Sequence, residues 1–148
     1  MTRGALWAGA ALLLGLGAPP ALGGCSHDAP DATPEGAVKL FLDEMEQASD
    51  DPRLMRAAYG LLGPAARANL EERARRTTRS LGRQAQPWEM LAAGRFGLAF
   101  RPKTMHRAVV GDRASVEVFG ASPQTERASV LCVHEAGGWR VEPGLPGP

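Results

Sequence analysis

The sequence lacks an excess of charge of either sign. Its 148 residues include 17 lysines and arginines against 16 aspartates and glutamates, which gives a formal net charge of +1. A nucleic-acid-binding domain typically carries a clear basic excess on one face. The balanced charge therefore argues against general nucleic-acid binding.

The sequence also lacks the short motifs that carry well-known chemistry. It contains no glycine-rich phosphate loop, no paired-cysteine motif and no nucleophile elbow. The three histidines are His27, His106 and His134, of which the last two fall in separate predicted strands and could be neighbours. A zinc site needs three or four converging ligands, and no pattern of acids or cysteines supplies the rest. We therefore expect no metal, no cofactor and no catalytic residue.

No apolar run is long enough to span a bilayer, which takes roughly 20 apolar residues. A shorter run covers residues 5–16, after Arg3 and before Pro19 and Pro20. A basic start, a short apolar stretch and helix-breaking residues form the layout of a secretory signal peptide. The N-terminus therefore predicts export.

The segment Leu22-Gly23-Gly24-Cys25 follows that stretch. An aliphatic residue, two small residues and a cysteine in this order resemble the lipobox of bacterial lipoprotein precursors. The resemblance implies cleavage between Gly24 and Cys25 and attachment of fatty acyl groups, such as palmitate, to Cys25. Each buried methylene adds about 0.8 kcal/mol to membrane binding, so two or three chains anchor a protein firmly. Ser26 stands where an aspartate retains lipoproteins in the inner membrane, which favours the outer membrane, facing the periplasm.

The alternative is an ordinary cleaved signal peptide with Cys25 as a structural thiol. In either case the signal peptide covers residues 1–24, and residues 25–32 form a polar tether with too little apolar content to fold. Residues 33–142 suffice for one ordinary domain, and the proline- and glycine-rich residues 143–148 form a disordered tail. With Cys25 acylated, Cys132 has no disulfide partner, and its apolar surroundings predict a buried thiol.

The first half of this domain has the apolar spacing of amphipathic helices. A first helix begins at Thr33-Pro34, because threonine caps a helix and proline suits its first position. Further helices are expected over residues 52–62 and 65–81, with a short helical turn over residues 86–91.

In the second half the apolar period changes to two, which is typical of strands. Phe96, Leu98 and Phe100 alternate as in a short edge strand or a packed loop. Short glycine-containing turns then separate strands that we expect over residues 106–110, 113–119, 126–134 and 139–142, which predicts an antiparallel sheet. The fold class is therefore α+β, with N-terminal helices packed on a curved antiparallel sheet of three to five strands.

The opening amphipathic helix, the hairpin of residues 109–116 and the closing Gly137-Gly138-Trp139 segment together resemble the nuclear transport factor 2-like, or ketosteroid isomerase-like, fold. The resemblance covers roughly residues 34–142. It implies a cone in which the curved sheet and the first helix enclose a pocket. In enzymes of this class that pocket holds a catalytic carboxylate, often with a tyrosine.

We find no such pair in the sequence. The only tyrosine, Tyr59, has the spacing of a core residue, and Asp112 occupies a hairpin turn where aspartate is favoured for backbone reasons. Glu117 alternates with Val116 and Val118, and we expect it to face solvent rather than a pocket. Trp88 and Trp139 are expected in the core.

An arginine-rich stretch on the third predicted helix is a second candidate site. Guanidinium groups bind phosphates and carboxylates in bidentate fashion. The candidate contacts for an anionic envelope component are Arg75, Arg76, Arg79 and Arg83. The competing interpretation is a solvated helix face, partly neutralised by the acids of the first helix, Asp43, Glu44 and Glu46.

Three functions remain open at this point. The first is a non-enzymatic, membrane-anchored lipoprotein that binds a ligand or an envelope protein. The second is a small pocket enzyme of the isomerase or hydratase kind, which needs an acid or base with a shifted pKa in a dry cavity. The third is an electrostatic binder of anionic envelope components through the arginine-rich helix.

Overall fold

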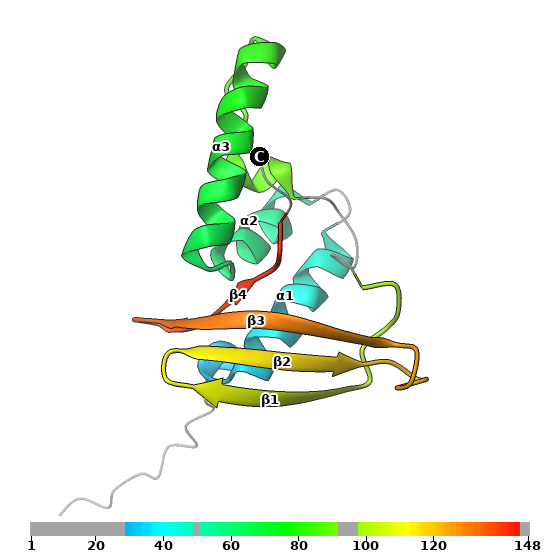
Figure 1. The fold of residues 1–148 in the computed structure, drawn as a ribbon. Helices are drawn as coiled ribbons and strands as arrows, with labels where there is room; N and C mark the ends of the chain where they lie inside the picture. Colours follow the sequence, from blue (N-terminus) through cyan, green and yellow to red (C-terminus); the bar gives the residue numbers. More distant parts are fainter. Residues whose placement is uncertain (1–28, 49–50, 92–97, 146–148) are drawn as a thin grey trace, which may run out of the picture.

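The computed structural model describes residues 29–48, 51–91 and 98–145. Along the chain, the helical half comes first and a four-stranded antiparallel sheet follows (Figure 1). The predicted α+β class is confirmed for the described residues.

Three α-helices form the first half, and each begins at a proline. In α1 (Pro34–Gln47) the Oγ1 of Thr33 accepts a hydrogen bond from the N–H of Gly36 at 3.1 Å, as a capping threonine should. The carboxylate of Asp51 caps α2 (Pro52–Gly60) in the same way. The third helix, α3 (Pro64–Leu81), ends at Gly82, whose φ of 67° is the left-handed conformation typical of a helix end. Its C-terminal half extends away from the sheet (Figure 1).

The sheet is a simple meander. Strands β1 (Thr104–Val110), β2 (Arg113–Phe119), β3 (Arg127–Glu135) and β4 (Gly138–Glu142) are neighbours in chain order, and all pairs are antiparallel. The predicted strands lie within two residues of these bounds.

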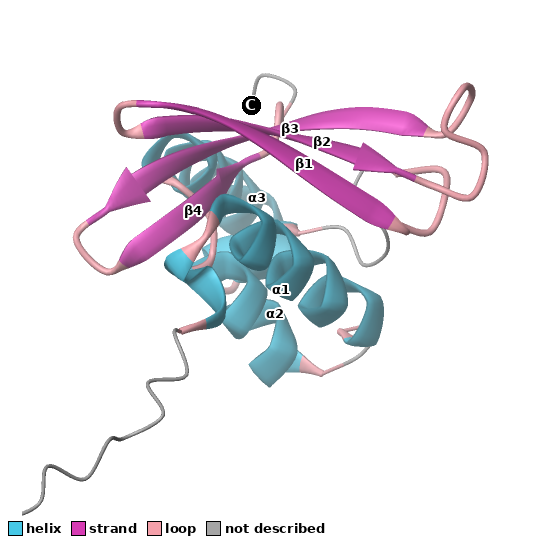
Figure 2. Ribbon diagram, turned by 90° about the horizontal axis from the view of Figure 1, so that it is seen from below, coloured by secondary structure: helices cyan, strands magenta, loops and turns pink. Residues whose placement is uncertain are grey.

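One face of the sheet packs against the helices, and the opposite face is not covered by any helix of the described residues (Figure 2). Ala114, Val116 and Val118 of β2 are at most 4% exposed on the covered face. Phe41 and Met45 of α1 are buried in the same hydrophobic cluster, to which all three helices and strands β2, β3 and β4 contribute. The described helices and strands therefore share one core.

The junction between α2 and α3 is also joined to the sheet. The N–H of Gly63 donates to the carbonyl of Val141, and the N–H of Val141 donates to the carbonyl of Leu61, both at 2.8 Å. These bonds make a parallel bridge between Leu62 and Val141. The sequence predicted that the second helix ends at Leu62, but α2 ends at Gly60. The reason is that Leu61 and Gly63 bond to β4 instead of continuing the helix.

The structure differs from the sequence-based expectations at both ends of the domain. Residues 30–32, placed in the tether, form a 3-10 helix, η1 (Pro30–Ala32), which packs against α1 and β4. The side chain of Asp31 holds it there by an ion pair with Arg140. In the predicted tail, Leu145 packs against the core. Residues 146–148 lie outside the described residues.

Between α3 and the sheet, the described residues agree with the sequence-based expectations. A second 3-10 helix, η2 (Pro87–Met90), forms where a helical turn was expected. Leu98 and Phe100 are 9% exposed and lie in a packed loop rather than an edge strand. Phe96 lies outside the described residues.

Candidate functional site

An apolar cleft of about 600 Å³ lies between α1, the helix-facing side of the sheet and the segment that follows β4. Helical spacing brings Val38 and Phe41 of α1 to the wall, and strand alternation brings Ala128 and Val130 of β3 to the opposite wall. Leu145 closes one side. Small-molecule sites have volumes of about 300–1,000 Å³ and are mostly apolar, so the cleft has the size and lining of such a site.

The charged groups around the cleft are already engaged. Of the described lining residues, Glu142 alone carries a carboxylate. Its Oε1 accepts a hydrogen bond from the N–H of Ala65 at 3.0 Å, and its Oε2 accepts one from the N–H of Ala66 at 2.9 Å. Both oxygens of this carboxylate are therefore occupied by N–H groups in the first turn of α3. The described lining residues of the cleft therefore include no free carboxylate that could transfer a proton.

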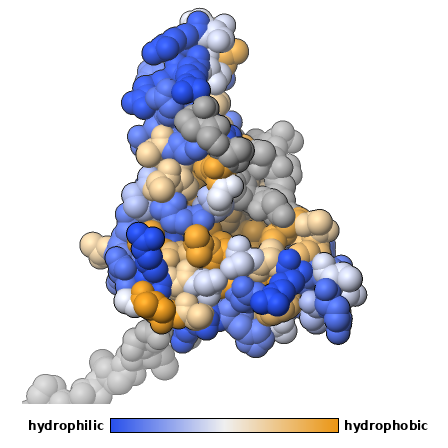
Figure 3. All heavy atoms as spheres, viewed as in Figure 1, coloured by the Kyte–Doolittle hydropathy of each residue, from blue (hydrophilic) through white to orange (hydrophobic). Residues whose placement is uncertain are grey.

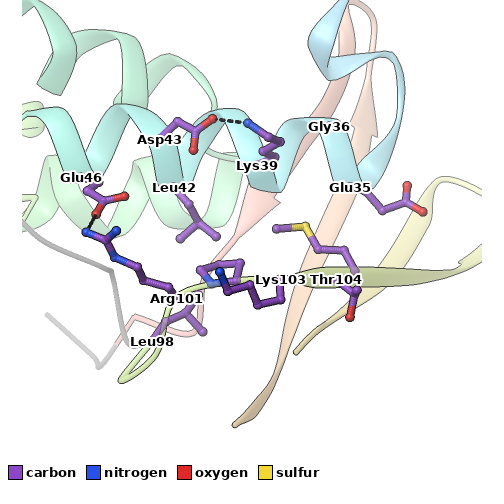
Figure 4. A pocket seen from close by; sticks show the side chains of 12 residues that line it. Glu35, Gly36, Lys39, Leu42, Asp43, Glu46, Leu98, Arg101, Lys103 and Thr104 are labelled. Carbon is purple, nitrogen blue, oxygen red and sulfur yellow. Dashed lines mark hydrogen bonds and ion pairs between the residues drawn. The ribbon is translucent and has the colours of Figure 1, made fainter. Parts of the chain in front are cut away.

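A second groove of about 510 Å³, called the polar groove here because charged residues line it, lies between α1 and the segment that leads into β1 (Figure 4). Its floor is apolar and consists of Leu42, Leu98 and Met105. Its rims carry charges of both signs, from α1 on one side and from Arg101 and Lys103 on the other.

Most of the groove's charges are paired. Lys39 contacts Asp43 at 2.5 Å within α1, and Arg101 contacts Glu46 across the groove at 3.0 Å. Lys103 is exposed and makes no ion pair with any residue that the structure describes. Among the described residues, Lys103 is therefore the one free cation of the groove, above its apolar floor.

Of the candidate arginines, Arg75, Arg76 and Arg79 lie on α3, where Figure 3 shows hydrophilic residues over the outer end of the helix, and Arg83 follows that end. Arg75 and Arg76 both pair with Glu72, at 2.5 and 3.0 Å, and their hydrogen bonds lower the pKa of Glu72. Arg83 pairs with Glu89 at 3.0 Å. Among the described residues Arg79 makes no ion pair. Three of the four candidate contacts are thus already bound to local acids.

One interpretation of the sequence was that acids of the first helix partly neutralise these arginines. The structure shows no such ion pair among the described residues. Asp43 and Glu46 bind Lys39 and Arg101, as described above. Glu44 is only partly exposed, and its Oε2 is buried without a hydrogen-bond partner among the described residues. The neutralising acids are closer in sequence. Glu72 lies three and four residues before Arg75 and Arg76, and residues at this spacing are neighbours on a helix. Glu89 reaches Arg83 from η2.

The two strand histidines are not brought together. His106 lies on the uncovered face of the sheet, 5.7 Å from the ring centre of Phe119. His134 packs edge-on against Trp139 at 5.1 Å, on the helix-facing side. Within residues 29–48, 51–91 and 98–145, no group of three or more histidines, cysteines and acids is placed to hold a metal ion. His27 lies outside the described residues.

Cys132 is buried, as the sequence predicted. Its side chain is 2% exposed, and it forms no disulfide. Burial, followed by the charges of Glu35 and Glu142, raises the pKa of the Cys132 thiol to about 12. A thiol in this state is a poor nucleophile.

Tyr59 packs against the core cluster, as its spacing predicted, but its side chain is only half-buried. Its hydroxyl donates a hydrogen bond to Oε1 of Glu71 at 3.1 Å. Partial burial and the neighbouring Glu71 raise the pKa of Tyr59, against a smaller lowering by Arg67. Glu71 therefore binds a tyrosine instead of the arginine four residues later.

Other predicted site residues have clear positions. Glu117 lies on the uncovered face, paired with Arg127 at 2.5 Å, so it does not enter the cleft. Asp112 lies in the hairpin turn, as expected. Trp139 is 8% exposed in the core, but Trp88 is half-buried beneath the guanidinium of Arg56 at 4.8 Å.

Sequence reasoning missed the polar groove and the helix cap. Lys103 and Arg101 stand in a short polar connection that has no recognisable motif. Glu142 reads in sequence as the last residue of a strand, and its contact with α3 joins positions 76 and 77 residues apart. No local pattern carries that information.

The predicted lipidation residue Cys25 and the cleavage position after Gly24 lie outside the described residues. The described part of the chain contains no helix with the length and hydropathy needed to cross a membrane. No protein-family model, curated protein or solved structure matches this chain.

Proposed function

We propose that this protein is an exported bacterial lipoprotein, cleaved after Gly24 and anchored by acyl chains on Cys25. The support is the segment Leu22-Gly23-Gly24-Cys25 placed directly after a short apolar run. With Ser26 next to the cysteine, the proposed location is the outer membrane, facing the periplasm. In this proposal the domain is a non-enzymatic binding module held at the cell envelope.

The proposed fold type of the domain is the nuclear transport factor 2-like, or ketosteroid isomerase-like, cone. The support is the order of helices followed by a meander, with α1 lying across the sheet and an open cleft between them. The parallel bridge between Leu62 and Val141 also holds the junction of α2 and α3 against β4.

The apolar cleft is the observation that carries the binding function. Its volume fits a small ligand, and the carboxylate beside it is held as a helix cap. An apolar lining without a free acid or base favours retention of an apolar ligand, such as an acyl chain, over catalysis. The isomerase-like alternative therefore has no observation in its favour. The same holds for the arginine-rich helix, whose arginines mostly bind Glu72 and Glu89.

The anchor is tested by fractionating cells that express the wild-type chain or Cys25→Ala, followed by intact-mass measurement. We expect wild-type protein in the membrane fraction, beginning at residue 25 with the mass of added acyl chains. The Cys25→Ala chain should keep its leader or lack acyl chains. Wild-type protein in the soluble fraction, or with an unmodified residue 25, would defeat the proposal.

The cleft is tested with the fluorescent fatty acid cis-parinaric acid and the chain from Ser26 onward, which keeps every described helix and strand. We expect saturable fluorescence enhancement, and its loss in Ala128→Phe, because Ala128 lines the cleft. The matched control is Ala108→Phe, on the uncovered face of β1. No saturable signal, or the same loss in both variants, would exclude a ligand in the cleft.

A further inference from the structure

Strand β1 leaves one edge of the sheet unpaired. The sheet order is β1-β2-β3-β4, so β1 has one neighbour among the described residues. The strand is seven residues long and contains no proline. Natural sheets usually block such an edge, because its unpaired backbone groups bind other strands. Val109 and Val110 on this edge strand are 46% and 81% exposed.

The hydrogen-bond pattern identifies which backbone groups are free. The N–H of His134 donates to the carbonyl of Asp112, and the N–H of Gly120 donates to the carbonyl of Glu126. The even-numbered residues of β2 therefore bond to β3, and its odd-numbered residues bond to β1. In the β1–β2 register these odd-numbered residues face residues 104, 106, 108 and 110. The N–H and C=O groups of Met105, Arg107 and Val109 consequently point to the open edge.

The polar groove runs beside this edge. Thr104 and Met105 of β1 form one wall, and Glu35, Lys39 and Asp43 of α1 belong to the other (Figure 4). An added strand sends alternate side chains to opposite faces. Side chains of a strand paired with β1 would thus enter the groove on the helix side, above Met105 and Leu42.

The charge of the edge selects the partner. Residues 100–110 contain Arg101, Lys103, His106 and Arg107, and they contain no acid. Arg101 and Arg107 are balanced by Glu46 and Glu35 of α1, whereas Lys103 has no ion pair among the described residues. Pairing of β1 with a second copy of itself would place basic strands side by side, and like charges directly opposite destabilise a sheet. An acidic strand meets no such repulsion from β1, and the acids of α1 that line the groove are already paired with Lys39, Arg101 and Arg107.

We propose that β1 and the adjacent groove bind an extended, acidic segment of a partner protein by strand addition. Backbone bonds at Met105, Arg107 and Val109 supply the affinity, and the groove and Lys103 select alternating apolar and acidic side chains. This proposal rests on the proposed binding function and names its partner class. The groove adjoins the apolar cleft, because Leu42 and Leu98 line both, whereas no residue of β1 lines the cleft.

The test uses the full chain, purified from whichever cell fraction contains it, and a fluorescein-labelled peptide Gly-Ser-Val-Glu-Val-Glu-Val-Glu-Gly, in which valine and glutamate alternate. Fluorescence anisotropy should show saturable binding below about 1 mM. One control peptide carries three lysines in place of the glutamates. A second carries N-methyl groups on alternate backbone amides, which removes donors while keeping the charges. We expect both to bind at least about tenfold more weakly.

Protein variants separate strand addition from general attraction. Val109→Pro removes one outward N–H without breaking the bonds to β2, and proline is tolerated on edge strands. Lys103→Glu reverses the free charge, and Arg79→Glu on α3 is the charge-matched control. We expect the first two variants to weaken binding about tenfold or more, and Arg79→Glu to have little effect. Circular dichroism checks that each variant is folded.

Three results would overturn the proposal. The first is no saturable binding of the acidic peptide. The second is equal binding of the lysine or N-methylated peptide, or an unchanged affinity in Val109→Pro. The third is a dimer in sedimentation that Val109→Pro dissociates, because a second copy would then occupy the edge. Binding of cis-parinaric acid is measured on the same samples, so failure at the edge and failure at the cleft are distinguishable.

Discussion

The carboxylate of Glu142 caps α3, because its Oε2 accepts a hydrogen bond from the N–H of Ala66 at 2.9 Å. The N-cap position of α3 is Gly63, which has no side chain to accept a hydrogen bond. A Cβ on Gly63 would lie 2.3 Å from Oε1 of Glu142. The glycine thus makes room for a cap that arrives from the last strand of the sheet.

Removing this cap should lower the free energy of unfolding. A capping side chain contributes about 0.5–2 kcal/mol, and we expect Glu142→Ala to lose an amount in that range. Glu142→Gln keeps one acceptor oxygen and should lose less. Urea unfolding followed by circular dichroism measures both. Glu46→Ala, which removes an exposed carboxylate from α1, serves as the control; equal losses in Glu46→Ala and Glu142→Ala would contradict the role of Glu142 as a cap.

Gly138 should tolerate substitution much less well than Gly111. Gly138 has a φ of 137°, and a Cβ there would lie 2.8 Å from the backbone carbonyl oxygen of Asp31. Gly111 also has a positive φ, of 62°, but a Cβ there meets nothing within 4 Å. Gly111→Ala should cost only the left-handed strain, about 1–2 kcal/mol. Gly138→Ala should lower the free energy of unfolding by more than Gly111→Ala does, because it also displaces η1. Thermal or urea unfolding measures both. A smaller loss in Gly138→Ala than in Gly111→Ala would refute the close contact between Gly138 and Asp31.

The buried thiol of Cys132 should make stability depend on alkaline pH. Its folded pKa of about 12 exceeds the ordinary value of 9.0. The unfolded chain therefore loses this proton first, and the contribution is full below pH 9 and decreases as the pH rises towards 12. The slope is at most about 1.4 kcal/mol per pH unit. The difference in unfolding free energy between wild type and Cys132→Ala isolates this effect. A difference that stays constant from pH 8 to pH 11 would disprove it.

Tyr59 allows a direct titration, because it is the only tyrosine in the chain. Its pKa is raised above 10.0 first by partial burial and then by its hydrogen bond to Glu71. Absorbance at about 295 nm against pH should give a midpoint above that of free tyrosine amide. Glu71→Gln should move the midpoint back, because it removes the nearby negative charge. An ordinary midpoint in the wild-type chain would show that the contact is absent in solution.

The elements that the sequence predicted well are those with strong local chemistry. Thr33-Pro34 set the start of α1, Asp51-Pro52 that of α2, and Gly111-Asp112 the hairpin of β1 and β2. Strand alternation also placed Val116 and Val118 on the buried face. Each of these signals lies within a few residues of the feature it determines.

The features that escaped prediction depend on distant partners. Asp31 looks like part of a polar tether until Arg140, 109 residues later, pairs with it. Tyr59 has core spacing, but Glu71 on the next helix holds its hydroxyl at the surface. The polar groove likewise joins α1 to residues 101–105. Local patterns carry no record of which distant element supplies the neighbour.

The bridge between Leu62 and Val141 has a consequence for how the protein is made. During synthesis the helical half leaves the ribosome before Val141 and Glu142 do. Until they emerge, the junction between α2 and α3 lacks its hydrogen bonds to β4. A nascent chain halted before residue 139 would lack the cap of α3, the bridge and the buried Trp139 together. Completion of the fold is thereby tied to β4, and a chain that stops before residue 139 should be readily degraded by proteases.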